Sequence, residues 1–370
     1  PISGALRGFC VSQLVWAYES HTDMIARGIG IDPLELRRKN LLQEGRPQAT
    51  GTLMRDAALS PVLERLAEIM EWSKPFDHGT GTIRRGRGLA IGFKASIAPT
   101  TSVAMVTVHA GGGCTVTCGT VDMGQGSDTT MAMIAAEVLG LPLVAVKVTH
   151  PDTDVTPYDM ATLGSRSTYH MGNAVRRAAE DARDKVIALA REVGLADDAS
   201  IEDVFKKRYG MKAGTIVGTG QFVPSYAPTD HATCQSPDVT PNWMIGATGA
   251  EIEVDTETGH VRVTRLVNVV DAGTPLNPRV VDSQVFGAAL MQLGFTLFEE
   301  MHFDGGQVTN ASLADYKIPG MLDVPASVVN EAVEAHERGG PFGAKGVGES
   351  GTFSVSPAIA NALEIGRAHV

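Results

Sequence analysis

One carboxylate, that of Glu349, lies among four glycines in the stretch PFGAKGVGESGT at residues 341–352. Glycine has no side chain, so its backbone can approach a bulky group very closely. A carboxylate held in such a segment is a candidate general base beside a large cofactor. The alternative is a surface ion pair between Glu349 and Lys345, four residues earlier in the chain.

Two other turns combine glycine with polar side chains directly before a predicted helix. They are MGQG at residues 123–126 and GSRS at residues 164–167. Free amides at the start of a helix attract anions, and hydroxyl groups beside them make a plausible phosphate cradle. Neither turn has the lysine of a P-loop or the spacing of a dinucleotide-binding fold. The alternative is helix capping, by Ser127 or Asp128 in the first turn and by the hydroxyls of the second.

An amide side chain, Gln284, lies in an apolar helix predicted for residues 283–300. A buried amide needs hydrogen-bond partners, which either the backbone or a ligand can supply. The sequence alone leaves both possibilities open.

The elements that must position these residues mix helices and strands without strict βαβ repetition. Asp32 and Pro33 predict the cap and first turn of a short helix, and residues 74–86 have the composition of a linker. Spacing and alternation predict helices over 11–30, 129–140, 169–193, 283–300 and from 354, a hairpin over 102–120, a strand over 143–150 and a hairpin over 250–268. We therefore expect an α+β fold with mixed sheets and packed helices.

Composition narrows the possible classes of protein. The 370 residues are long enough for one large or two ordinary domains, and the net charge of −11 argues against nucleic-acid binding. No apolar run approaches the roughly 20 residues that cross a bilayer, so no membrane association is expected. The four cysteines form no CxxC pair, which predicts a cytoplasmic location, and Cys114 and Cys118 are expected to be core thiols, the alternatives being metal ligands or a disulfide. Any iron–sulfur cluster must then lie on another polypeptide.

Taken together, these stretches resemble the large, molybdenum-binding subunit of the xanthine oxidase family of molybdenum hydroxylases. Residues 4–13, GALRGFCVSQ, resemble the Arg-Gly-Phe-Gly turn of that family, and residues 32–40 resemble its Asp-Pro-x-Glu-Leu-Arg-x-Lys-Asn run. The elements occur in the family's order and cover nearly all of residues 1–363. The combination is specific, although each motif alone is weak.

The resemblance implies a molybdenum ion held by the dithiolene of a molybdopterin, in its cytosine dinucleotide form, with no direct protein ligand to the metal. It implies that Glu349 takes a proton from a metal-bound hydroxyl group. An electron-poor carbon of an aldehyde, purine or N-heteroaromatic substrate is then hydroxylated with water as the oxygen source. It further implies a hetero-oligomer in which partner subunits carry the iron–sulfur clusters and FAD.

The resemblance also assigns site residues. Phe9 matches an aromatic wall of the substrate pocket, where ring stacking orients a flat molecule. Cys10 replaces a glycine of the family, and Gly8 occupies the position of the copper-binding cysteine of aerobic carbon monoxide dehydrogenases, so that subfamily is not expected. A second aromatic wall near Phe93 or Lys94 is left unassigned. The expected cofactor contacts are Arg7, Met123, Gly124, Gln125, Gly126, Gly164, Ser165, Ser167, Gln284, Lys345 and Gly348.

The predicted organisation has three parts. Residues 1–80 are expected to end a first cofactor-binding lobe, and residues 81–363 to form most of a second. We interpret residues 364–370, EIGRAHV, as read-through of a sequencing adapter, the alternative being a genuine helix end. Residues 1–370 alone are expected to be inactive and to retain no molybdenum. The alternative functions are a hydroxyaroyl-thioester reductase of the same family and a non-catalytic scaffold subunit.

Overall fold

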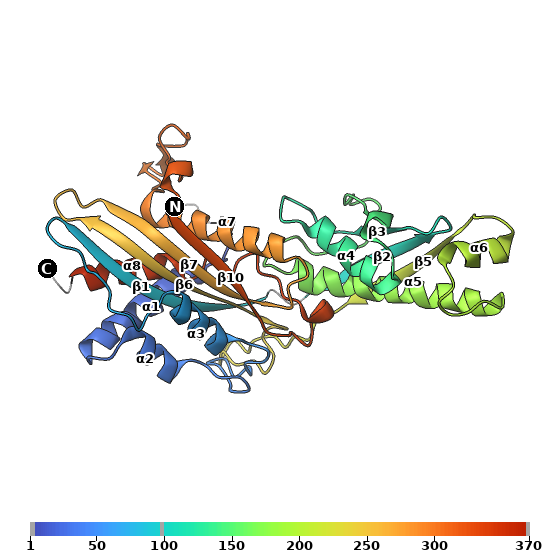
Figure 1. The fold of residues 1–370 in the computed structure, drawn as a ribbon, viewed down its shortest axis with the longest axis horizontal. Coiled ribbons are helices and arrows are strands. Elements are labelled where there is room, and N and C mark those ends of the chain that lie inside the picture. The colour runs from blue at the N-terminus through green and yellow to red at the C-terminus, as the bar shows by residue number, and fades with distance from the viewer. Residues whose placement is uncertain (1–3, 97–99, 368–370) are drawn as a thin grey trace.

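Two four-stranded mixed sheets lie one after the other along the long axis of the molecule (Figure 1). The computed structural model describes residues 4–96 and 100–367. The first sheet has the strand order β1-β6-β7-β10, in which β10 is parallel to β7 and the other pairs are antiparallel. Its strands are β1 (Ile83–Ala95), β6 (Trp243–Asp255), β7 (Val261–Gly273) and β10 (Ser327–Glu334).

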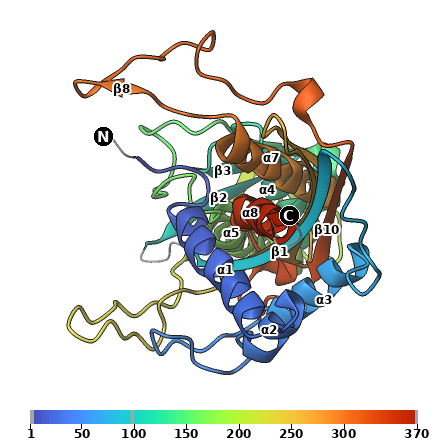
Figure 2. The same ribbon diagram turned by 90° about the vertical axis from the view of Figure 1, so that its left-hand side faces the viewer.

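Helices cover both faces of the first sheet. One face packs against α3 (Leu59–Ile69) and α2 (Pro33–Asn40), and the other against α7 (Pro278–Leu297) and α8 (Val355–Arg367). Figure 2 shows the sheet curving around α8, with α2 and α3 outside the curve. The helix α1 (Val11–Gly28) packs against α8, α2 and β1. This half of the chain therefore has three layers.

The second sheet has the order β4-β3-β2-β5, with β4 parallel to β3. Along β2, buried and half-buried side chains alternate without exception, as expected for a strand that is covered on one face. The covering helices are α4 and α5, and α6 packs against α5. These elements are β2 (Ser102–His109), β3 (Cys114–Cys118), α4 (Ser127–Leu139), β4 (Val146–Val148), α5 (Gly172–Glu192), α6 (Ile201–Tyr209) and β5 (Thr215–Phe222).

The expected α+β fold with mixed sheets is confirmed, as are both hairpins and the cap of α2. The Asp32 carboxylate accepts hydrogen bonds from the amides of Leu34 (2.9 Å) and Glu35 (3.2 Å). Cys114 and Cys118 are free and buried, and burial raises the pKa of both thiols to about 11, so they are core thiols as predicted.

Several boundaries differ from the expectation. The linker is shorter than residues 74–86, because β1 already begins at Ile83. The predicted strand 143–150 is a short 3-10 turn (Leu143–Ala145) followed by three residues of β4. The helix predicted from residue 169 begins as a π-helical turn (Ser167–Met171) before α5. The sequence did not predict α3, α6 or the small hairpin of β8 (Phe303–Asp304) and β9 (Gln307–Val308).

The helix α7 is long and apolar enough, by length and composition alone, to cross a membrane. Core helices pass the same test, and α7 packs against β7, β10 and α8. The helix α8 runs through Arg367, residues 368–370 lie outside the described residues, and the adapter interpretation of residues 364–370 stays a prediction.

Candidate functional site

The carboxylate of Glu349 receives donors from three segments that are far apart in the sequence. Its Oε1 accepts a hydrogen bond from the amide of Gly8 (3.0 Å), and its Oε2 accepts one from the Ser165 hydroxyl (3.2 Å). The Lys94 Nζ lies 3.1 Å from the same Oε2. Glu349 is 7% exposed, so its charge is held by these groups more than by water. The predicted base is therefore not a surface residue, and its ion-pair partner is Lys94 instead of Lys345.

Arg7 connects this carboxylate's segment to α7. Its Nη2 donates to both the side-chain and the backbone oxygen of Gln284, each at 2.9 Å, and its Nε donates to the backbone oxygen of Gly348. Burial lowers the pKa of Arg7 from its ordinary value, while the negative charge of Glu349 opposes that shift. The predicted residues Arg7, Gln284 and Gly348 thus lie together beside Glu349.

The glycines before Glu349 let its segment pack against the turn that contains Ser165. A Cβ atom at Gly346 would collide with the backbone oxygen of Ser165, and one at Gly348 would lie 3.2 Å from the Ser165 hydroxyl oxygen. The sequence led us to expect that these glycines make room for a metal centre. At Gly346 the room is instead filled by the protein's own backbone.

A buried arginine supports the Ser165 turn. Gly164 (φ 61°) and Ser165 (φ 57°) both have left-handed backbone conformations. Between Ser165 and the π-helical turn that begins at Ser167, Arg166 points into the protein and is 1% exposed. Its Nη1 lies 2.5 Å from Asp159 Oδ1, and its Nη2 donates to the Ser102 hydroxyl (2.9 Å). The ion pair between Arg166 and Asp159 anchors the turn in the protein interior, and Ser165 on the same turn contacts Glu349.

The Asp122 carboxylate, which was not among the predicted site residues, holds the backbone of the turn at residues 123–126 in place. Its carboxylate accepts hydrogen bonds from the amides of Gly124 (2.8 Å), Gly126 (3.4 Å) and Asp128 (3.1 Å). Burial alone would raise the pKa of Asp122, but these amides and that of Ser127 together lower it. The N-cap residue of α4 is Gly126, and neither Ser127 nor Asp128 caps the helix; the Asp122 carboxylate instead accepts from the amide of Asp128 in the first turn.

Gln125 closes the same turn with its side chain. Its Oε1 accepts from the amide of Met123 (2.6 Å), and its Nε2 donates to the backbone oxygen of Val121 (2.7 Å). Met123 is 68% exposed. In this conformation the Gln125 amide holds the turn, and the exposed surface next to it comes from Met123.

This turn packs against the first part of α7. A Cβ atom at Gly126 would lie 3.1 Å from the side chain of Val280, which precedes Gln284 by one helical turn. Gly124 has a φ of 98°, and no heavy atom lies within 4 Å of the place that its Cβ would take. The turn thus packs against α7, the helix that also carries Gln284, and its backbone at Gly124 faces open space.

Phe9 lies directly after the backbone that holds Glu349. It is 48% exposed and, like Cys10, has a left-handed conformation, with φ angles of 41° and 67°. The chain turns sharply here, because the amide of Phe9 donates to Leu6 O (2.7 Å) and that of Val11 to Gly8 O (3.0 Å). The left-handed φ of Cys10 is a conformation that glycine adopts most readily, which fits the expectation that Cys10 replaces a glycine.

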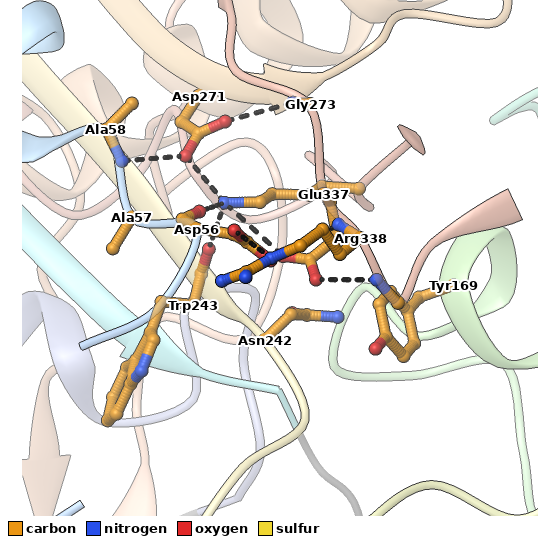
Figure 3. Close-up of polar contacts among 12 residues, drawn as sticks. Asp56, Ala57, Ala58, Tyr169, Asn242, Trp243, Asp271, Gly273, Glu337 and Arg338 are labelled. Carbon is orange, nitrogen blue, oxygen red and sulfur yellow. Dashed lines mark hydrogen bonds and ion pairs between the residues drawn. The ribbon is translucent and has the colours of Figure 1, made fainter. Parts of the chain in front are cut away.

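Lys345 lies in a different cluster, whose members Asp56, Trp243, Asp271 and Glu337 are labelled in Figure 3. Its Nζ donates to Asp271 Oδ2 (2.6 Å), to Trp243 O (3.3 Å) and to the backbone oxygen of Asp56, and it lies 3.7 Å from Glu337 Oε2. These contacts use the donors of the ammonium group. They favour a structural role and do not support the predicted cofactor contact.

Lys94 was not predicted as a partner of Glu349, although the sequence contains a signal for a buried lysine at this position. A lysine at the end of an apolar strand, GLAIGFKA, is unusual, and it is 4% exposed. The ring of Phe93 packs against Trp243 with centroids 5.5 Å apart, so the next side chain lies on the opposite face of the sheet. That face is the one toward Glu349.

Comparisons with known proteins identify the family of this chain. Models of the molybdopterin cofactor-binding domain match residues 1–41 and 63–325. A putative xanthine dehydrogenase molybdenum-binding subunit of Escherichia coli K12 is 33% identical over 99% of this chain and 51% of its own length. The chain therefore spans about half the length of this curated relative. The predicted boundary near residue 80 stays a prediction.

Solved structures give the same result. The aldehyde oxidoreductase from Desulfovibrio gigas is 29% identical, with a TM-score of 0.85 over 97% of this chain and 39% of its own. Quinoline 2-oxidoreductase from Pseudomonas putida 86 is 25% identical, with a TM-score of 0.85 over 99% of this chain and 50% of its own. This chain belongs to the molybdopterin cofactor-binding domain family, among the molybdenum hydroxylases of the xanthine dehydrogenase and aldehyde oxidoreductase type.

Proposed function

We propose that this chain forms the catalytic, cofactor-binding part of an enzyme that hydroxylates an electron-poor carbon of an aldehyde, a purine or an N-heteroaromatic compound, with water as the oxygen donor. The observation that carries the proposal is the buried Glu349 carboxylate, which the amide of Gly8, the Ser165 hydroxyl and Lys94 hold in place. A carboxylate positioned in this way can accept a proton from a reacting group.

The residues present fit a pterin cofactor with a nucleotide tail, which we propose is the cytosine dinucleotide form. Gly124 presents backbone with open space where a side chain would lie, in a turn whose Gly126 packs against Val280 of α7. Hydroxyl groups at Ser165 and Ser167, ahead of a helix, suit phosphate oxygens. In the structure the Ser165 hydroxyl donates to Glu349, so a phosphate contact requires this hydroxyl to rotate or to be shared.

When bound, the molybdenum centre supplies the oxidising power and activates the oxygen that comes from water. The protein's own residues do the rest. Glu349 accepts the proton at a carboxylate oxygen, the Gly8 amide and Ser165 hydroxyl fix the orientation of that carboxylate, and Arg7 holds Gly348 against Gln284. The half-exposed ring of Phe9 is placed to stack on a flat substrate.

We further propose that electrons leave through iron–sulfur clusters and FAD on partner subunits, in a cytoplasmic hetero-oligomer. Two observations support separate subunits. The chain has four cysteines without cluster spacing, and the Escherichia coli relative is named as a molybdenum-binding subunit. Residues 1–370 by themselves are expected to bind no molybdenum, and stoichiometric metal in that purified chain would contradict this expectation.

The test is Glu349→Gln in the intact enzyme. General-base catalysis contributes about 10²- to 10⁴-fold, so we expect kcat to fall by at least that range while the molybdenum content stays unchanged. Glu257→Gln, in the exposed turn between β6 and β7, is the matched control and should keep full activity. If Glu349→Gln oxidises an aldehyde, a purine or an N-heterocycle at the normal rate, the proposed role of Glu349 is wrong.

A further inference from the structure

Lys94 is a buried cation whose ionic partner is the proposed base. Its Nζ lies 3.1 Å from Glu349 Oε2, and its one other described polar contact is the backbone oxygen of Ala95 at 3.2 Å. Within residues 4–96 and 100–367, no second carboxylate lies within ion-pair distance of Lys94. Glu349 is therefore the only described counter-ion of the buried Lys94 ammonium group.

The surroundings of Lys94 are apolar. In the β1–β6 pairing it is directly opposite Met244, and directly opposite residues share one face of a sheet. Met244 is 1% exposed and packs with Val15 and Phe353, which follows Glu349 by four residues. Water screens a charge poorly in such surroundings, so the attraction between Lys94 and Glu349 is stronger than at a surface.

The other groups that face Glu349 are few. Arg7 is the second cation and donates to Gln284 and to the backbone of Gly348. Gly8 and Ser165 contribute neutral donors, and Gln284 on α7 is neutral. Among the described residues, the Glu349 carboxylate therefore faces two cations and no second anion.

We propose that Lys94 is a positioning residue for Glu349: its ammonium group holds the Oε2 of the carboxylate in place, and its removal should change the pH dependence of the reaction. This inference rests on the proposed function of Glu349. A neighbouring cation favours the charged form of a carboxylate. When Glu349 takes up a proton, Lys94 loses its counter-ion, so the pair also favours release of that proton before the next turnover.

The experiment compares three variants of the intact holoenzyme. Lys94→Met keeps the length of the side chain and removes its charge, Lys94→Arg keeps the charge, and Lys147→Met removes a charge from an exposed position on β4. We expect the acidic limb of the kcat/KM pH profile to move up by about one to two pH units in Lys94→Met, since an opposite charge at this distance has an effect of this size. Lys94→Arg should restore most of the wild-type profile, and Lys147→Met should not change it.

A second readout does not depend on activity. In the cofactor-free protein, the infrared band of the protonated Glu349 carboxyl group is identified by its loss in Glu349→Gln. Its midpoint on acid titration should move up in Lys94→Met by the same one to two units. If Lys94→Met folds and neither midpoint moves, the inference is wrong and Lys94 only fills a buried position.

The outcomes separate this inference from the proposed function. If Glu349→Gln remains active, the proposed function fails, and the infrared midpoint still decides whether Lys94 controls the ionisation of Glu349. If Lys94→Met does not fold, the double variant Lys94→Met/Glu349→Gln decides, because it removes both charges. Recovery of folding in the double variant supports the coupling, and continued failure to fold contradicts it.

Discussion

Two buried lysine–carboxylate pairs lie at either end of the same short segment. Lys345 and Glu349 are four residues apart, yet Lys345 pairs with Asp271 at 2.6 Å, whereas Glu349 pairs with Lys94 at 3.1 Å. All four residues are at most 7% exposed. By residue type and burial alone, the two pairs cannot be told apart.

Their surroundings differ in how completely the polar groups are satisfied. The ammonium of Lys345 also donates to the backbone oxygens of Asp56 and Trp243, and Asp271 Oδ2 accepts from the amide of Ala58 (3.2 Å) (Figure 3). This cluster ties the segment before α3 to β7 and to the segment that carries Lys345. Around the other pair, the Lys94 ammonium has one described acceptor besides Glu349, the backbone oxygen of Ala95, and the exposed residue Phe9 follows Gly8, whose amide contacts Glu349.

The difference shows how a structural pair can be distinguished from a functional one: by how many of its hydrogen-bonding groups already have partners. A buried pair whose donors and acceptors are all used holds the fold together, and changing it changes stability. A buried pair whose ammonium group has donor capacity left, close to exposed residues, can take part in chemistry. The comparison predicts that variants of the Lys345 pair lose stability before activity, and that variants of the Glu349 pair do the reverse.

The largest effect on stability is expected for Lys345→Met. Removing the ammonium leaves Asp271 and Glu337 buried with one cation fewer, and breaking such a pair costs about 3–5 kcal/mol of unfolding free energy. Urea unfolding measures the loss. Lys147→Met on the exposed edge of β4 should stay within about 0.5 kcal/mol of wild type. A loss below about 1 kcal/mol for Lys345→Met would contradict the structural role of the Lys345–Asp271 pair.

The next effect is expected for Gly346→Ala. The added Cβ collides with the backbone oxygen of Ser165, which cannot move as a side chain can, so we expect a cost of about 1–3 kcal/mol and a lower molybdenum content. Gly28→Ala, at the end of α1 where a Cβ meets no atom within 4 Å, is the control. Full molybdenum content in Gly346→Ala would show that the contact between the two segments is not needed for cofactor binding.

A pH-dependent effect is expected at Glu337. Burial raises the pKa of this carboxyl group from 4.5 to about 7, with Lys345 partly opposing the shift. The folded state then binds the proton more tightly than the unfolded state, so stability falls as pH rises from about 4.5 to about 7. Between pH 5 and pH 8, wild type should lose on the order of 2 kcal/mol more than Glu337→Gln does. Equal slopes for the two proteins in urea unfolding would contradict the raised pKa.

The smallest effect is expected for Gln125→Ala. The variant loses the three hydrogen bonds that the Gln125 side chain makes in an exposed turn, with Met123, Val121 and Ser127, which costs about 1 kcal/mol. If the turn also contacts the cofactor, molybdenum content falls while thermal stability changes little. Lower stability with unchanged molybdenum would show that the turn serves only as a helix start.

Local signals explain what could be predicted from the sequence. Asp32 before Pro33 predicted the start of α2, and alternation predicted the β2–β3 hairpin; the family motifs predicted Glu349 as the base, and this role stays a prediction. Each of these depends on residues that are neighbours in the chain. The helix α3 was not predicted, although its apolar residues Val62, Leu63 and Leu66 are spaced for a helix and are buried in the structure.

The partners of the charged residues could not be predicted, because they depend on packing between distant segments. Lys345 had a plausible partner by distance in the chain, Glu349, but the structure pairs Lys345 with Asp271 and Glu349 with Lys94. Which lysine reaches Glu349 depends on the face of β1 that Lys94 occupies and on how closely Gly346 approaches Ser165. A single sequence fixes neither of these contacts.

The central claim is that distant turns meet around Glu349 to hold the molybdenum cofactor. Anomalous diffraction at the molybdenum absorption edge, on crystals of the intact loaded enzyme, tests it most directly. We predict one peak beside the Glu349 carboxylate, on the side of Gln284 and the turn at residues 123–126. A peak elsewhere, for example in the cavity of about 450 Å³ lined by residues that include Tyr169 and Glu337, would contradict the assignment of the site.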